Sequence, residues 1–423
     1  MIAAWSSTST VNVVNEGNSR IDYAGRWTTT SHSAYLGGRA KSTRASGASA
    51  RFRFTGAAIA WVGPVGPTRG KAKVYIDGAY VTTVNSRADT FQPARVLFKK
   101  SWSTVGTHRI AIVALGTAGR PTVALDAFVV RRDLGASTSG TTYAAVFSGD
   151  ATGATDVTSA LRSFLQSHNG QRVALATNGV YKVTQLSFTA SNLTVDFRGA
   201  RLQGSQAGAH GILRIVSSTN VVLNDPRVHG TGYVWADATQ WEHGIHVDGG
   251  SGITLNHPIT RDTRGDGIFT GYDPGRTTPP TGVVINDPDV ERAARNGIAP
   301  VGGQVTIRGG HIAYVGLHGI DFEPNDATEA GSIRGIVDGV DIRRYGDRPV
   351  GYMGYAISAG WGHLSTMKPS LLIQNNTGDR LSIVVMNTTS VRILDNTSDA
   401  SAIAEIIASG SVSFSGNVRI TRL

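Results

Sequence analysis

Hydrophobic and polar residues alternate along the first third of the chain in the manner of half-buried strands. The alternation runs through residues 50–56, 58–63, 73–84, 108–115 and 122–130, and a period of two is that of a strand with one buried face. Asp77 and Gly78 interrupt the third segment with the composition of a tight hairpin turn. We therefore predict an antiparallel β-sandwich over residues 1–133, followed by a linker of small residues over 134–142.

The periodicity changes between Thr155 and His168, where apolar residues recur at helical spacing. They fall on one helical face and comprise Val157, Leu161, Phe164 and Leu165. Thr155 and Asp156 precede them as capping residues. Short strand-like stretches then continue to the C-terminus. A second domain over residues 143–423 that opens with a short amphipathic helix is the prediction.

A tripeptide repeats through this second domain. HGI begins at His210, His243 and His318, DGI at Asp266 and NGI at Asn296. The shorter intervals match one coil of a solenoid, and the longer ones contain insertions over 231–241 and 272–280. A second ladder places asparagine at one point of successive coils, in Asn224, Asn256 and Asn286, where it suits a turn. The repeats predict a parallel β-helix, and the unpaired strand edges of its first coil need a cover such as this helix.

The repeat predicts three columns of outward side chains. Alternate strand residues face opposite sides, so the isoleucine after each glycine faces inward. The columns before glycine, two after it and four after it hold, in turn, His210, His243, Asp266, Asn296 and His318; Leu213, His246, Phe269, Ala299 and Asp321; and Ile215, Asp248, Gly271, Val301 and Glu323. With strands ~4.8 Å apart, these columns form a patch long enough for several sugar units.

Acids and histidines of this patch are candidates for acid/base chemistry. We expect Asp321 and Glu323 to be catalytic, with Asp266 assisting and His318 tuning their proton affinity, because glycoside hydrolysis needs two carboxyls beside the scissile bond. The residues expected to bind substrate are His243, His246, Asp248, Asn296, Arg295, Trp241, Trp235 and Tyr272. In the alternative interpretation the acids only pair with arginines and solvate the coil.

Composition and net charge limit the classes of binding partner that are expected for this chain. The formal charge is +10 without a run of basic residues, so an anionic glycan is a candidate and nucleic acid is not expected. The chain has no cysteine and no apolar run long enough to span a membrane. The first residues do not have the pattern of a secretory signal, and no trimerising tail is recognised, so we expect a monomer.

Two resemblances extend this picture. The segment AVFSGDATGATDVTSALRSFLQ with the later NGVYKVTQL is similar to the opening of pectate-lyase-like right-handed parallel β-helix proteins, which include carbohydrate-active enzymes and phage tailspikes. Residues Trp27 to Val130 resemble a jelly-roll accessory module of secreted actinobacterial enzymes, which implies carbohydrate binding. Its candidates for stacking on sugar rings are Trp27, Tyr35, Trp61 and Trp102, unless these rings belong to the core.

The resemblance leaves the reaction open. Gly316 to Gly319 partly matches the GHG motif of polygalacturonase-like hydrolases, but no RIK motif exists. Lyases of this fold use a Lys or Arg base, often beside calcium, and the β-helix half has Lys182 and Lys368 outside the columns. GYDPGR at 271–276 is similar to the YGFDPH site of alginate epimerases but has glycine for the histidine, which disfavours epimerisation.

We therefore expect an extracellular glycoside hydrolase acting on a cell-wall or capsular polysaccharide. The alternatives are a lyase of the same fold, or a non-catalytic glycan-binding adhesin or phage tail protein. No cofactor is required, although calcium could bind among Asp321, Glu323 and Asp326.

Overall fold

The chain folds into two compact units, residues 1–141 and 142–423. The computed structural model describes residues 11–18, 20–131, 142–206, 210–234, 240–272, 278–325, 327–346, 354–360, 370–407 and 409–423. The predicted linker over 134–142 lies outside the described residues except for its last one. No helix in the described part is long and apolar enough to cross a membrane.

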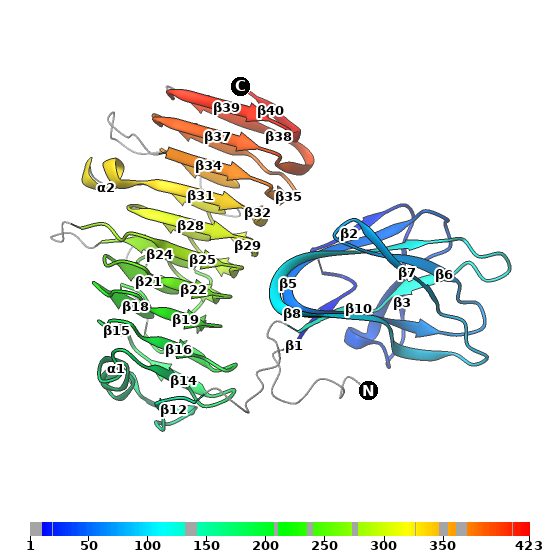
Figure 1. Ribbon diagram of the computed structural model, residues 1–423, viewed down its shortest axis with the longest axis horizontal. Coiled ribbons are helices and arrows are strands. Elements are labelled where there is room, and N and C mark those ends of the chain that lie inside the picture. The colour runs from blue at the N-terminus through cyan, green and yellow to red at the C-terminus, as the bar shows by residue number, and fades with distance from the viewer. Residues whose placement is uncertain are drawn as a thin grey trace. The chain divides into compact units, whose positions relative to one another are not determined.

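The first unit is an antiparallel β-sandwich, as predicted (Figure 1). One sheet has the order β1-β10-β5-β8-β6-β7, with β2 also paired to β5, and the other has the order β3-β4-β9. The strands are β1 (Val11–Asn15), β2 (Ile21–Ala24), β3 (Thr28–Ser31), β4 (Arg39–Thr43), β5 (Ser49–Val65), β6 (Lys71–Ile76), β7 (Ala79–Asn85), β8 (Gln92–Ala114), β9 (Val123–Leu125) and β10 (Ala127–Arg131), with a 3-10 turn at Leu36–Gly38. The predicted hairpin at Asp77 and Gly78 joins β6 to β7, and both residues have the positive φ of a tight turn.

Most of the aromatic rings considered for sugar stacking belong to the sandwich core. Trp61 is fully buried, and its Nε1 donates a hydrogen bond to the Ala124 carbonyl at 3.1 Å. Tyr35 is also buried, while Trp27 and Trp102 are half-buried against the core. Trp102 stacks on His108 with ring centroids 3.9 Å apart. Trp61 and Tyr35 therefore present no open face to a sugar ring.

The second unit is a parallel β-helix whose coils have three faces (Figure 1). Face A contains β11 (Ala145–Val146), β13 (Arg172–Ala174), β16 (Thr194–Asp196), β19 (Val222–Asn224), β22 (Thr254–Asn256), β25 (Val283–Asn286), β28 (Gln304–Arg308), β31 (Arg334–Asp338), β34 (Ser370–Gln374), β37 (Ser390–Leu394) and β39 (Ser411–Ser415). Face B contains β12 (Thr152–Asp156), β14 (Val180–Val183), β17 (Arg201–Gly204), β20 (Arg227–His229), β23 (Ile259–Thr263), β26 (Asp289–Ala293), β29 (His311–Val315), β32 (Asp341–Tyr345) and β35 (Thr377–Gly378).

Face C contains β15 (Leu186–Phe188), β18 (Leu213–Val216), β21 (Ile245–Asp248), β24 (Ile268–Gly271), β27 (Ile298–Pro300), β30 (Ile320–Phe322), β33 (Ile357–Ala359) and β36 (Ile383–Met386). β38 (Thr397–Ile407) pairs with both β35 and β36, and β40 (Val418–Arg422) pairs with β38. Inward side chains of all three faces form one continuous apolar core, because stacked coils bury a core that no single coil could.

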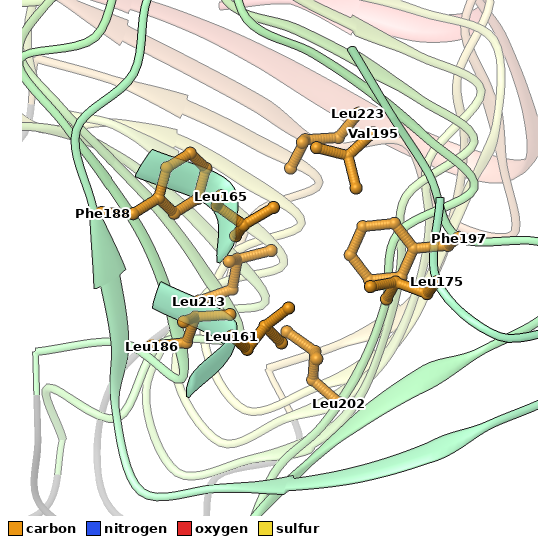
Figure 2. A pocket seen from close by; sticks show the side chains of 10 residues that line it. All are labelled: Leu161, Leu165, Leu175, Leu186, Phe188, Val195, Phe197, Leu202, Leu213 and Leu223. Atoms are coloured by element: carbon orange, nitrogen blue, oxygen red, sulfur yellow. The ribbon is translucent and has the colours of Figure 1, made fainter. Parts of the chain in front are cut away.

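The predicted capping helix is present but shorter than expected. Helix α1 spans Thr158–Gln166 with Val157 at its N-cap, and Asp156, one residue before the N-cap, accepts a hydrogen bond from the Thr158 N–H at 2.8 Å. Leu161 and Leu165 point from α1 into the end of the solenoid, toward the small void shown in Figure 2. The ten side chains that line this void are all apolar, so it is a dry packing defect and not a ligand site.

Leu161 should hold the cap on the solenoid. Its side chain is 1% exposed, so Leu161→Ala removes buried methyl groups beside an existing void and should lower the free energy of unfolding by about 2–5 kcal/mol. Ser163→Ala, on the exposed side of the same helix, is the matched control and should change it by less than about 0.5 kcal/mol. Chemical denaturation measures both. Equal effects of the two variants would show that the helix does not seal the coil.

The asparagine ladder is structural, as predicted. Asn256 Nδ2 donates to Asn224 Oδ1, and Asn286 Nδ2 donates to Asn256 Oδ1, each at 2.9 Å. The left-handed backbone, however, falls on the residue after each asparagine, namely Asp225, His257 and Asp287 at φ of 51 to 52°. The asparagines end the strands of face A, and the turn begins one residue later.

The longest connections of the β-helix all border face C. Faces A and B are joined by two-residue turns at 225–226, 257–258, 287–288, 309–310 and 339–340. Much longer segments enter or leave face C: 230–244, 272–282, 323–333, 346–356 and 360–369. The segment 323–333 includes helix α2 (Ala327–Ser332). In a solenoid, insertions gather beside the functional face, so face C is where a site is expected.

Candidate functional site on face C

The repeated tripeptide is explained by the contacts between coils. Its third residue enters the core, since Ile245, Ile268, Ile298 and Ile320 are fully buried. Its glycine leaves room for the next coil, because a Cβ on Gly267 would lie 2.7 Å from the Gly297 carbonyl oxygen. On Gly297 it would lie 2.5 Å from the Gly319 carbonyl oxygen. Any side chain there would push neighbouring coils apart.

The first residue of the tripeptide accepts a backbone hydrogen bond from the next coil. The His243 Nδ1 accepts the Asp266 N–H at 3.1 Å, and Asp266 Oδ1 accepts the Asn296 N–H at 2.9 Å. Asn296 Oδ1 then accepts the His318 N–H at 3.1 Å, and the His318 Nδ1 accepts the Tyr355 N–H at 3.0 Å. These polar residues therefore satisfy buried backbone donors before any chemistry is considered, and they stack as predicted.

The predicted columns need one correction, in the first coil. The tripeptide at His210 is out of step by one residue, because Leu213 pairs with Ile245 and Ile215 with Val247. Leu213 and Ile215 are therefore core residues, and Arg214 takes the outward position. The two-residue period of a strand reverses every side chain when the register slips by one.

Asp321 lies on β30 and Glu323 directly follows that strand, and the two carboxyls interact. Asp321 is 2% exposed. Burial raises the pKa of Asp321 to about 7, with the charge of Asp266 adding to the rise and the Ser358 hydroxyl and Arg295 opposing it. Burial, followed by the Asp321 charge, raises the pKa of Glu323 to about 8. Two carboxyls that interact in one buried site do not both ionise, so the pair holds a proton at neutral pH.

Asp266 supplies an ionised carboxylate beside this pair. Burial alone would raise its pKa, but the Arg295 charge and His243 outweigh burial and lower it. The Arg295 Nη1 lies 3.8 Å from Asp266 Oδ2. His243 Nδ1 is also 3.1 Å from Oδ2, but it already accepts the Asp266 N–H. Asp266 is fully buried, and its Oδ2 makes no hydrogen bond within the described residues.

His318 is neutral. Burial lowers its pKa to about 4, although the Glu323 charge acts in the opposite direction. Since its Nδ1 accepts the Tyr355 N–H, the ring proton lies on Nε2. Its ring stacks on Tyr355 with centroids 5.8 Å apart. His318 thus offers a hydrogen-bond donor and no positive charge to the pair.

His246 and Asp248, two further polar residues of the predicted patch, lie on β21, three coils away from the carboxyl pair. Asp248 is fully buried and bridged by Arg214, whose Nε lies 3.1 Å from Asp248 Oδ2. The His246 Nδ1 donates to the His210 carbonyl at 3.0 Å, and burial lowers the pKa of His246 well below its usual value. Buried Phe269, Ala299 and Val301 lie between this cluster and the carboxyl pair. The predicted polar patch is therefore continuous in the column before the glycine, from His243 to His318, and is interrupted by apolar residues in the other two columns.

The aromatic candidates differ in exposure. Trp241 is 42% exposed, and the Arg295 guanidinium lies 5.5 Å from its ring centroid, which places an open aromatic face beside the acidic site. Tyr272 is buried at 9% exposure and offers no such face. Trp235 lies outside the described residues.

No group of three or more histidines, aspartates or glutamates is placed to hold a metal ion among the described residues. Asp326, named for the calcium alternative, lies outside them. A carboxyl pair that retains a proton is also a poor ligand for a hard cation, because metal binding requires deprotonated carboxylates.

Tyr355 and Ser358 belong to the site but were not predicted. They lie in the coil of β33, where Ile357 pairs with Ile320 and Ser358 pairs with Asp321. Ala356 stands there in place of the glycine of the tripeptide, so this coil lacks the residue by which the other coils are recognised in the sequence. Matching the buried isoleucine in the sequence Tyr355-Ala356-Ile357 would have found it.

Known proteins resemble this chain only over a short stretch or at low sequence identity. No family model matches the chain. A 104-residue stretch is 34% identical to an A type blood alpha-D-galactosamine galactosaminidase of Flavonifractor plautii, covering 25% of this chain and 10% of that protein. The chain thus spans about a tenth of the length of that relative.

Two solved structures cover 98% of the chain and are themselves covered to 98%. One is the Agl-KA catalytic domain, at 11% identity and a TM-score of 0.38. The other is the catalytic domain of a GH87 alpha-1,3-glucanase in complex with nigerose, at 12% identity and a TM-score of 0.37. Likeness this low assigns no role to any residue of this chain, whose chemistry must be argued from its own site.

Proposed function

We propose that the β-helical unit is a glycoside hydrolase that cleaves a polysaccharide bound along face C. The observation that carries the proposal is the buried Asp321 and Glu323 pair, which keeps a proton at neutral pH because burial raises both pKa values. A carboxylic acid protonated at neutral pH is what cleavage of a glycosidic bond requires of its general acid. The glycosidase relative and the glucanase neighbours are compatible with this chemistry.

The carboxyl pair and Asp266 have separate roles in the proposed reaction. The Asp321 and Glu323 pair donates its proton to the glycosidic oxygen as the bond from that oxygen to the anomeric carbon breaks. Asp266 Oδ2 takes a proton from water, whose oxygen bonds to the anomeric carbon. Afterwards a proton returns from Asp266 to the pair through solvent, so that each turnover adds one water molecule to the substrate.

The spacing of these groups favours inversion at the anomeric carbon. Asp321 and Glu323 act together as one proton-holding group in this proposal, so the second catalytic carboxyl is Asp266. Asp266 lies two coils below Asp321, or ~9.6 Å along the solenoid axis before side-chain reach is counted. That separation leaves room for a water molecule between base and sugar, as in inverting enzymes.

A product screen tests the proposal against its alternatives. The intact chain and the Asp321→Asn variant are incubated with neutral and acidic bacterial and plant polysaccharides, and new reducing ends and the ultraviolet absorbance of unsaturated ends are recorded. Saturated oligosaccharides that disappear in the variant are expected. Unsaturated products would reveal a lyase, and tight binding without any product would identify a glycan-binding adhesin. Either result would overturn the hydrolase proposal.

Arg295 should set the pH range of activity. Its charge lowers the pKa of Asp321, Glu323 and Asp266, so Arg295→Gln should raise all three. The pair then keeps its proton to higher pH, and Asp266 becomes ionised at a higher pH, which moves both limbs of the kcat/KM profile upward. Arg295→Lys keeps the charge and should leave the limbs near their original positions. Unmoved limbs in Arg295→Gln would contradict the assigned roles.

The oligomeric state, the location and the carbohydrate contacts of the protein belong to the same proposal. The protein acts as a monomer outside the cell on a cell-wall or capsular glycan, and Trp241 provides an aromatic platform beside the acidic site. The first unit holds the enzyme to a carbohydrate. Size-exclusion chromatography with light scattering tests the monomer, and Trp241→Ala should raise KM more than it lowers kcat if the ring only binds substrate.

A further inference from the structure

The positive charge of the chain belongs to its first unit. Residues 1–141 contain 18 Lys and Arg but 6 Asp and Glu, a formal net charge of +12. Residues 142–423 contain 22 Lys and Arg and 24 Asp and Glu, a net charge of −2. The basic residues of the first unit form no continuous run because they alternate with apolar ones along its strands.

Alternation gathers five cations on the outer face of one sheet. We call this surface the basic sheet face, and it comprises Arg51, Arg53, Lys71, Lys73 and Arg109. All five are exposed, while the residues between them are buried. Arg51 and Arg53 lie on β5, Lys71 and Lys73 on β6, and Arg109 on β8, which runs between β5 and β6.

The basic sheet face holds like charges close together. Arg53 is the direct cross-strand partner of Arg109, and like charges in that position are destabilising. Two acids border the surface. Asp22 lies opposite Arg51, with its Oδ2 4.0 Å from Arg109 Nη2, and Asp77 accepts the Arg109 N–H. Among the described residues these two acids border five cations, so the surface keeps a net positive charge that suits an anionic ligand.

Two tyrosines adjoin these cations. Tyr75 shares a row with Arg51 across β8, since both pair with Ala111. Tyr80 is 56% exposed, and its ring centroid lies 5.9 Å from that of Tyr75. An exposed aromatic ring beside arginines offers stacking area for a sugar ring together with forked donors for a carboxylate.

We propose that the basic sheet face binds a polyuronate, a polysaccharide with one carboxylate on each sugar ring. Adjacent strands are ~4.8 Å apart, so these cations match a ligand whose charges are closely and regularly spaced and whose rings are in reach of Tyr75 and Tyr80. The choice of a glycan over a nucleic acid rests on the function proposed above. The site lies wholly within the first unit and takes no part in cleavage.

Binding by the full chain tests this inference. The probe is polygalacturonate, compared with the same polymer after methyl esterification and with a short duplex DNA, and dissociation constants are measured over a range of salt concentrations. Arg51→Gln with Lys73→Gln should weaken polygalacturonate binding at least 10-fold and flatten its dependence on salt, because fewer counterions are released. Lys99→Gln with Arg392→Gln removes the same net charge outside the surface and should change binding less than threefold.

Each other outcome overturns the inference. Equal binding of the esterified polymer would show that the surface does not recognise carboxylates. Equal losses of affinity in the two double variants would show that only total charge matters. Tighter binding of DNA than of polygalacturonate would identify a nucleic-acid surface. The same titrations with Asp321→Asn keep cleavage out of the measurement. A chain that cuts glycans but binds no polyuronate would refute this inference and leave the hydrolase proposal standing.

Discussion

Asp321→Asn and Glu323→Gln should each reduce kcat/KM by about 10²- to 10⁴-fold, the usual contribution of a positioned acid or base. Either change removes one of the two carboxyls that share the proton, while the amide keeps the shape and a hydrogen-bonding partner. Asp266→Asn should cause a loss of similar size, because it removes the ionised carboxylate and still accepts the Asn296 N–H. Initial rates on the polysaccharide identified by the product screen measure these losses.

The pH profile and a control variant separate chemistry from folding. Activity of the unchanged protein should fall as pH rises past about 8, where the pair loses its proton. Glu291→Gln alters a carboxylate on face B, 3.6 Å from Arg261, and should leave kcat/KM within about threefold of the unchanged protein. A loss in Glu291→Gln as large as in Asp321→Asn, or full activity in both Asp321→Asn and Glu323→Gln, would remove the pair from the mechanism.

The regular part of face C was predictable because two physical demands recur in every coil. Each coil needs a glycine where a carbonyl of the next coil approaches and a buried isoleucine after it, as at Gly267 and Ile268. Both residues can be recognised directly in the sequence. The third demand, an acceptor for the next N–H, is met by histidine, aspartate or asparagine. Those residue types look catalytic in a sequence, and only the hydrogen bonds of the fold separate Asn296, a linker between coils, from Asp321.

The features of face C that could not be predicted from the sequence depended on strand register and on burial. Leu213 and Ile215 seemed to face outward because a repeated tripeptide was assumed to keep its phase, and the hydrogen-bond register moves it by one residue. Burial of the carboxyls was not predicted either, since outward residues of a solenoid are ordinarily solvated. Pro279, after β24, and Glu329, after β30, pack beside the end of β27, where a Cβ on Gly302 would lie 3.0 Å from Glu329 and 3.3 Å from Pro279. Burial of this kind is set by tertiary contacts that no single coil records.

The same burial that suits the pair for catalysis should make the protein more stable when the pair is removed. An unfolded aspartate ionises near pH 4, whereas Asp321 keeps its proton to about pH 7. Stability is therefore fully present below pH 4 and is lost as pH rises toward 7 or 8, because the unfolded state gains from ionisation and the folded state does not. At pH 8, Asp321→Asn should raise the free energy of unfolding by about 2–4 kcal/mol, and at pH 4 it should change little.

Asp341 on face B provides the opposite case in the same solenoid. Burial alone would raise its pKa, but the hydrogen bond with His311 and the charge of Arg343 lower it to about 2, with contacts of 3.0 and 2.9 Å. Its contribution is present above pH 4 and is lost as pH falls toward 2, so Asp341→Asn should destabilise the protein by about 2–4 kcal/mol at pH 7. Denaturant titrations at pH 4, 7 and 8 compare the two variants. If Asp321→Asn destabilised the fold at pH 8 as Asp341→Asn does, Asp321 would be an ordinary structural carboxylate and the strained proton-holding pair would not exist.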